Sequence, residues 1–104
     1  MDKPHYHGHR QRLRHRYLTS GLESFADYEA IELILTLAIP RKDVKQPAKE
    51  AMQRFGSFRG VLDASIDELQ QIVGLGKVAP VALRIIRDAV TRYLQQKSKE
   101  SFSL

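Results

Sequence analysis

The sequence predicts an all-α fold, a compact bundle of about five helices in a single domain. Apolar residues recur at helical spacing along almost the whole chain, and no stretch alternates convincingly at the period of two expected for a half-buried strand. Glycine and proline stand at the ends of the apolar segments, where helices usually stop. The length of 104 residues suits one small domain, and 42% hydrophobic with 28% charged residues is typical of a globular protein.

The spacing of apolar residues predicts two helices in the first part of the chain. The first is expected over residues 9–19, with Leu13, Tyr17 and Leu18 facing inward. The second is expected over residues 28–38, after an N-cap at Asp27. Apolar side chains surround nearly all of this second segment, so it should be the central helix of the core.

In the middle of the chain, apolar spacing together with stop and cap residues predicts a third helix and two short ones. The third is expected over residues 44–55, with Gly56 as its C-terminal stop. A short helix over residues 58–62 follows. Ser65 and Glu68 have the spacing of a capping box, in which each side chain binds a backbone N–H of the other, so another brief helix should begin there.

The last helix, expected over residues 77–96, has the clearest apolar pattern in the chain. We expect Ile85 on this helix, like Ile34 on the second helix, to be a core residue. The predicted apolar face comprises Val78, Val81, Ala82, Ile85, Ile86, Ala89, Val90, Tyr93 and Leu94.

These segments form one expected domain, residues 9–97, between a flexible arm (1–8) and a frayed tail (98–104). The chain has no cysteine, which excludes disulfides, cysteine nucleophiles and cysteine-containing zinc sites. The longest apolar stretch, residues 33–39, is far too short to cross a bilayer, and no hydrophobic region follows the basic N-terminus as in a secretory signal. A soluble, cytoplasmic domain without a membrane partner is therefore expected.

The net charge of +5 is unevenly distributed. Residues 1–20 hold five Lys or Arg against one acid, residues 21–76 hold six against nine, and residues 77–104 hold six against two. Two basic ends around an acidic middle would form a surface for a polyanion if the fold brings them together. The alternative is that the basic ends only keep a helical domain solvated.

The segment Gly74-Leu75-Gly76-Lys77 is the most informative for function. The two glycines let the backbone turn sharply between a short helix and the long last helix, and Leu75 can fold back into the core. Because Gly76 has no side chain, the amides at the start of the last helix can approach a phosphate closely. The helix dipole favours an anion there, and Lys77 adds a full positive charge.

This segment resembles the hairpin of the helix-hairpin-helix motif, over residues 65–90. The resemblance implies contact with a DNA backbone without reading of bases, and a fold of the SAM/HhH type. Pro80 stands where the motif usually has a small residue; it has no N–H, so a phosphate must use earlier amides, that of Val78 among them. Arg84 could reach the next phosphate. The alternative is a tight turn that only packs two helices. Residues 31–55 form a candidate degenerate copy, which we interpret as packing because it lacks the glycines.

Four arginines, Arg10, Arg12, Arg14 and Arg16, form a second basic segment. On a helix they pair at i,i+4 spacing, so their positive charges repel each other and require compensation. DNA phosphate is one candidate for that compensation, and acids of the same chain are an equally good one. The candidate acids are Glu23, Glu29 and Glu32.

The alternating His5, His7 and His9 are candidate metal ligands, yet no carboxylate or cysteine accompanies them in this segment. We therefore expect no bound metal and no cofactor. No nucleophile elbow, phosphate-binding loop of the NTPase type or paired catalytic carboxylates occur either, so no catalytic residue is assigned to this chain.

Four pieces of the chain together resemble the N-terminal half of bacterial RadC-like proteins. They are His7-Gly8-His9-Arg10-Gln11-Arg12-Leu13-Arg14, the helix at residues 27–38, Arg54-Phe55-Gly56-Ser57-Phe58, and the Gly-Leu-Gly segment at residues 74–76. The resemblance implies a helix-hairpin-helix module followed, in the family, by a metal-dependent JAB/MPN-type domain that this chain does not contain. The family carries a historical DNA-repair label.

The sequence thus predicts a non-catalytic, non-sequence-specific DNA-binding module that contacts phosphates. The expected contact residues are Gly74, Gly76, Lys77, Val78, Arg84, Arg10, Arg12, Arg14 and Arg16. The alternative is a structural or protein-interaction module, whose basic faces dock an acidic partner or the C-terminal domain expected from the family. The oligomeric state is left open.

Overall fold

The computed structural model describes the backbone of residues 5–102 and the side chains of residues 8–99. Within this range it contains six α-helices, one short 3-10 helix (η1) and no strand, which confirms the predicted all-α class. The elements are α1 (His5–Ser20), η1 (Leu22–Ser24), α2 (Asp27–Ala38), α3 (Lys45–Phe55), α4 (Phe58–Asp63), α5 (Ile66–Gln70) and α6 (Val78–Phe102).

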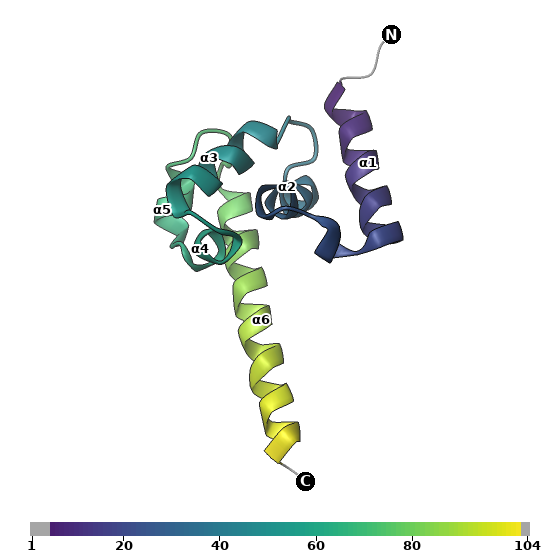
Figure 1. Cartoon of the computed structure of the whole chain (residues 1–104). Coiled ribbons are helices and arrows are strands. Elements are labelled where there is room, and N and C mark those ends of the chain that lie inside the picture. The colour runs from purple at the N-terminus through teal and green to yellow at the C-terminus, as the bar shows by residue number, and fades with distance from the viewer. Residues whose placement is uncertain (1–4, 103–104) are drawn as a thin grey trace.

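The second helix is central, as its apolar sequence predicts. α2 packs against α1 on one side and against α3, α4 and α6 on the other (Figure 1). The core between α2 and α6 consists of aliphatic side chains from every helix except α1. Its most deeply buried members are Ile31, Leu35, Ala48, Val61, Leu69, Ile72, Ala79 and Leu83.

The predicted caps explain where several helices begin and end. Ser65 Oγ accepts a hydrogen bond from the N–H of Glu68 at 3.1 Å, and the Glu68 carboxylate accepts one from the N–H of Ser65 at 3.0 Å. Gly56 ends α3 in a left-handed conformation, with φ of 86°. The predicted N-cap at Asp27 is wrong: Ala26 holds that position, and the Asp27 carboxylate instead accepts a hydrogen bond from the N–H of Phe58 at 2.9 Å.

The first helix begins earlier and the last ends later than the sequence pattern predicts. Residues 5–8, expected in the arm, form the first turns of α1, and residues 98–102, expected in the frayed tail, continue α6. Each extension contains a single apolar or aromatic residue, too few to form an apolar period that would reveal it. Residues 1–4 and 103–104 lie outside the described residues. Of the three residues of the first helix expected to face inward, Leu13 is buried, whereas Tyr17 and Leu18 are 47% and 80% exposed.

The buried face of α6 differs from the predicted one. Ala79, Pro80 and Leu83 lie in the core, whereas Ile85, expected there, is 61% exposed. Ile34 is partly buried against the core cluster. The apolar residues of α6 cover a wide arc of the helix, and the other helices cover only one edge of it. The C-terminal half of α6 projects beyond the body of the molecule, which measures 60 by 34 by 21 Å (Figure 1).

Candidate nucleic-acid interface

The turn between α5 and α6 has the backbone that its glycines predict. Gly74 and Gly76 have φ angles of 96° and 68°, in the region that glycine adopts without strain. Leu75 between them is 3% exposed and belongs to the core cluster, so it anchors the turn. Gly74 and Gly76 are therefore exposed at the surface, on either side of the buried Leu75.

The two glycines meet different surroundings. A Cβ atom at Gly74 would lie 2.8 Å from Cγ of Pro47, so this glycine permits close packing of the turn against α3. A Cβ atom at Gly76 would meet no atom within 4 Å. The space that a side chain at position 76 would occupy is therefore open to solvent. A phosphate that approaches the backbone of the turn would need this space to be free.

The start of α6 supplies donors and one cation beside this open space. The N–H groups of a helix's first turn have no acceptor within the helix, and the helix dipole makes this end positive. Lys77 is exposed and takes part in no ion pair with any side chain between residues 8 and 99. Val78 is 69% exposed, and Val73 at the other end of the turn is 83% exposed. Pro80 is buried and contributes no N–H.

Arg84 lies in less favourable surroundings for a phosphate. Its Nε is 3.8 Å from a carboxylate oxygen of Asp88, one turn further along α6. It also lines a shallow depression together with Asp63, Asp67 and Glu68. These carboxylates repel a phosphate, so the positive charge of Arg84 is largely offset locally.

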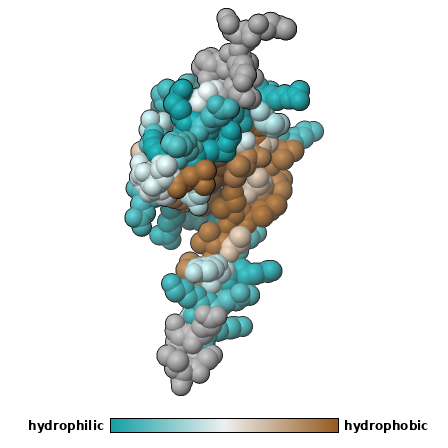
Figure 2. All heavy atoms as spheres, turned by 90° about the vertical axis from the view of Figure 1, so that its right-hand side faces the viewer, coloured by the Kyte–Doolittle hydropathy of each residue, from teal (hydrophilic) through white to brown (hydrophobic). Residues whose placement is uncertain are grey.

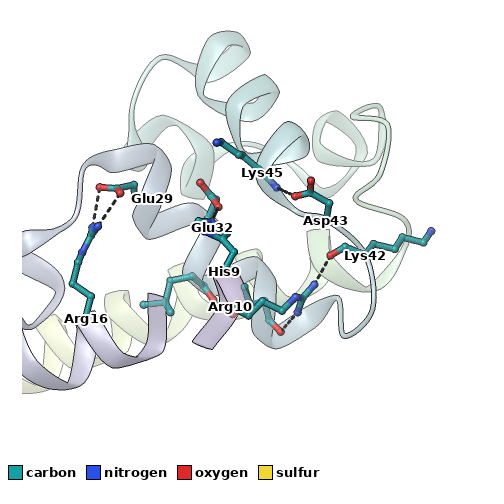
Figure 3. A network of polar contacts seen from close by, with 10 residues as sticks. His9, Arg10, Arg16, Glu29, Glu32, Lys42, Asp43 and Lys45 are labelled. Carbon is teal, nitrogen blue, oxygen red and sulfur yellow. Dashed lines mark hydrogen bonds and ion pairs between the residues drawn. The ribbon is translucent and has the colours of Figure 1, made fainter. Parts of the chain in front are cut away.

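The four arginines of α1 separate into two pairs. Arg12 and Arg14 are exposed. Arg10 is 6% exposed and donates hydrogen bonds to the carbonyl oxygen of Thr36, at 3.0 Å, and to that of Lys42 (Figure 3). It holds the C-terminal end of α2 and the following loop. Arg10 was predicted to contact DNA, and its guanidinium faces the protein interior.

Arg16 is likewise engaged within the chain. Its two terminal nitrogens each donate a hydrogen bond of 2.9 Å to the Glu29 carboxylate, and its guanidinium lies 4.0 Å from the ring centroid of Phe25 (Figure 3). The carboxylate also accepts a bond from the N–H of Ala26 at 3.0 Å. Arg16, bonded directly to Glu29, lowers the pKa of Glu29 to about 2, with the Ala26 bond as the next cause. The same pairing raises the pKa of Arg16.

The pairing of Arg16 with Glu29 confirms, for this arginine, the expected alternative of compensation by an acid of the same chain. His9 completes the polar attachment of α1 to α2, and its role and that of Arg10 were not expected from the sequence. Its Nε2 lies 2.7 Å from a carboxylate oxygen of Glu32, which is 1% exposed (Figure 3). We call His9, Arg10, Arg16, Glu29 and Glu32 the α1–α2 clasp. Glu32 and Thr36 lie four residues apart within the apolar segment of α2, residues 30–38. They are the signal that could have revealed it, since buried polar groups need partners.

Of the three alternating histidines, the structure describes the side chain of His9 alone. Among side chains 8–99, no group of three or more His, Asp or Glu residues has metal-binding geometry. His9 belongs to the clasp, and the side chains of His5 and His7 lie outside the described range. The absence of a metal or cofactor stays a prediction.

The connection between α2 and α3, the candidate degenerate copy, lacks the features of the α5–α6 turn. Between residues 5 and 102, positive φ angles occur only at Gly21, Gly56, Gly74 and Gly76, none of which lies in this connection. Arg41 and Lys42 are exposed there. The carbonyl oxygen of Lys42 in this connection accepts a hydrogen bond from Arg10. This part of its backbone is thus bound within the chain.

Fold and turn together define a small all-α domain whose most distinctive surface feature is a Gly-Leu-Gly turn opening its longest helix. No helix between residues 5 and 102 combines the length and apolar character needed to span a bilayer. The UPF0758 N-terminal family model matches residues 7–81. The chain therefore belongs to the UPF0758 family, and the resemblance to the N-terminal region of RadC-like proteins is confirmed.

Several curated relatives are UPF0758 proteins of bacteria. One from Fusobacterium nucleatum is 43% identical over 86 residues, covering 83% of this chain and 37% of the relative. One from Ruegeria pomeroyi is 39% identical over 84 residues (81% and 38%), and one from Rhodobacter capsulatus is 41% identical over 85 residues (82% and 40%). The chain thus spans about two-fifths of the length of these relatives. No solved structure matches it.

Proposed function

We propose that this chain is a non-catalytic module that binds the DNA phosphate backbone, with little preference for base sequence. One observation carries the proposal: the turn exposes open space above Gly76 beside the first amides of α6 and the exposed Lys77. A phosphate oxygen placed there would accept hydrogen bonds from backbone N–H groups, as anions do at other helix N-termini. Such contacts position a protein on DNA but carry no sequence information.

The remaining cations contribute unequally in this proposal. Arg12 and Arg14 are exposed and can extend the footprint if DNA also reaches α1. Arg10 and Arg16 are assigned to the clasp and drop out of the interface, and Arg84 contributes little because carboxylates surround it. We therefore expect few phosphate contacts, hence modest affinity with a strong dependence on salt.

The test is fluorescence anisotropy with single-stranded, duplex and branched DNA at several salt concentrations. Lys77→Ala should weaken binding to all sequences about equally and reduce the salt slope by about one. Lys49→Ala, which removes an exposed lysine of α3, is the matched control and should bind like the wild type.

A second pair of variants tests the backbone approach. Gly76→Ala places a methyl group in the open space and should weaken binding, because the phosphate can no longer reach the amides. Gly56→Ala has the same backbone penalty, a positive φ with nothing within 4 Å of the added Cβ, but lies outside the turn. It should bind DNA normally. Circular dichroism checks that both variants remain helical.

The alternative function is a protein-interaction or structural module in which the turn only packs helices. Absence of binding to every DNA form at low salt would favour that alternative. If DNA binds but Lys77→Ala and Lys49→Ala behave alike, the chain binds DNA through another surface and the hairpin mechanism is wrong.

A further inference from the structure

The cations at the surface of this chain divide into those with a carboxylate partner and those without one. The arginines at the end of α3, on α4 and on the first half of α6 each lie 3.3 to 3.9 Å from a carboxylate oxygen; they are Arg54, Arg59, Arg84 and Arg87. Arg41, Lys42 and Lys77 are among the exposed cations that form no ion pair with any side chain between residues 8 and 99. A cation without such a partner attracts a polyanion with its full charge.

Arg41 and Lys42, which we call the connection pair, lie at the same end of the molecule as the α5–α6 turn. They belong to the connection between α2 and α3, which leads directly into the first turn of α3, where Pro47 packs against Gly74. Figure 1 shows this connection and the α5–α6 turn at the upper end of the body. The few residues from Lys42 to Pro47 and from Gly74 to Lys77 limit the separation of the Cα atoms of Lys42 and Lys77 to about 40 Å, even with both segments fully extended.

The connection keeps a positive charge although it contains an acid, Asp43. The Asp43 carboxylate accepts a hydrogen bond of 2.9 Å from the N–H of Lys45 at the start of α3, where the helix dipole favours a negative charge. The side chain of Lys42 extends away from the ribbon, and that of Lys45 extends in the opposite direction (Figure 3). The connection pair therefore supplies two positive charges against one carboxylate that is bound at a helix N-terminus.

This end of the molecule is polar, and its backbone is held in place. Figure 2 shows mainly hydrophilic residues over the upper part of the side that it presents, with the apolar surface lower down. The buried Arg10 donates hydrogen bonds to the carbonyl oxygens of Thr36 and Lys42, so the segment that carries the connection pair is fixed on the body. A fixed segment loses less conformational entropy when a ligand binds.

We propose that the connection pair is a second phosphate contact, and that it and the α5–α6 turn hold one DNA duplex across this end of the molecule. The inference rests on the proposed function, in which Lys77 and the backbone at Gly76 form the first contact. A duplex carries one negative charge per about 1.7 Å of its axis, so phosphates are present wherever the two contacts lie along it. It is also stiff over this distance, so a duplex bound at the turn reaches the connection pair with little further loss of entropy.

The test is fluorescence anisotropy with a duplex of about 16 base pairs, which is about 54 Å long and exceeds the largest separation of the two contacts. The variant Arg41→Ala/Lys42→Ala should weaken binding and reduce the salt slope by about two, one for each phosphate contact that is lost. The matched control is Arg54→Ala/Arg59→Ala, which removes the same net charge from exposed arginines that have carboxylate partners. This control should bind like the wild type.

A combined variant tests whether both contacts bind the same duplex. The losses of binding free energy in Lys77→Ala and in Arg41→Ala/Lys42→Ala should add when the substitutions are combined, because the two contacts are separate and share no partner. Circular dichroism checks that every variant remains helical, as expected for substitutions at exposed positions. Equal loss of binding in Arg41→Ala/Lys42→Ala and in the control overturns the second contact, because the change in net charge alone would then explain it.

The outcomes distinguish a failure of this inference from a failure of the proposed function. If Lys77→Ala weakens binding while Arg41→Ala/Lys42→Ala binds like the wild type, the second contact is wrong and the proposed function is unaffected. The connection pair would then be left to another partner, such as an acidic protein. If the wild-type chain binds no DNA at low salt, the proposed function is wrong, and this inference with it. If only the connection pair matters, DNA does not lie across the turn and the shared contact is wrong.

Discussion

Pro47 on α3 and Gly74 in the α5–α6 turn approach each other so closely that no side chain fits between them. A Cβ atom at position 74 would lie 2.8 Å from the proline Cγ. The turn is therefore held by two contacts, Leu75 in the core and Gly74 against α3, while Gly76 between Leu75 and the helix has no such neighbour. Gly74 thus allows close packing against α3, and Gly76 leaves the space beside the start of α6 open.

The first prediction follows from this difference. Gly74→Ala should lower the free energy of unfolding by about 2–5 kcal/mol, the sum of left-handed backbone strain and overpacking against Pro47. Gly76→Ala should cost only the strain, about 1–2 kcal/mol. Urea denaturation of both variants measures the difference. Equal losses would contradict the close approach to Pro47.

The second prediction concerns the attachment of α1. Arg10→Ala should destabilise the chain by about 1–3 kcal/mol, because it leaves the buried carbonyl of Thr36 without its donor. Amide hydrogen exchange should then increase throughout α1 while α3 to α6 stay protected. Arg12→Ala, at an exposed position of the same helix, should change neither quantity. An unaltered α1 in the Arg10 variant would show that the clasp is not what holds it.

The third prediction is a pH dependence. The pKa of Glu29 is about 2 in the folded chain, below its ordinary value of 4.5, because Arg16 and the Ala26 amide bind the carboxylate. A lowered pKa means that the unfolded chain binds the proton more readily, so this contribution to stability is present above pH 4.5 and is lost as the pH falls from about 4.5 to about 2.

Thermal melts of wild type and Glu29→Gln across that range test it. The variant should be the less stable at pH 7, and the gap between the two should close toward pH 2. A gap that is the same at both ends would mean that the carboxylate charge is not responsible.

The fourth prediction distinguishes the two sides of α6. Leu83→Ala should cost about 2–5 kcal/mol, since this side chain is 1% exposed in the core. Ile85→Ala should change stability by about 0.5 kcal/mol or less, because the side chain is largely exposed. Chemical denaturation at low protein concentration measures both. The reverse order would mean that the helix is rotated.

The local rules of helix formation determined much of this protein from its sequence alone. The helical class, the capping box of Ser65 and Glu68, the left-handed stop at Gly56 and the positive φ angles of Gly74 and Gly76 all depend on residues within a few positions of one another. A capping side chain or a glycine acts on its own segment, so its effect can be read before the fold is known.

Only the tertiary structure decided which side of α6 is buried and which arginines of α1 face solvent. Apolar residues occupy a wider part of the α6 surface than the other helices cover. Their periodicity therefore predicted the helix but not which of its sides is buried, and the prediction that Ile85 is a core residue was wrong. Arg10 and Arg16 match Arg12 and Arg14 in type and spacing. They differ only because residues 13 to 32 positions away along the chain supply a carbonyl or a carboxylate to bind. Burial and pairing depend on what lies opposite a side chain, and that is fixed only when distant segments have packed.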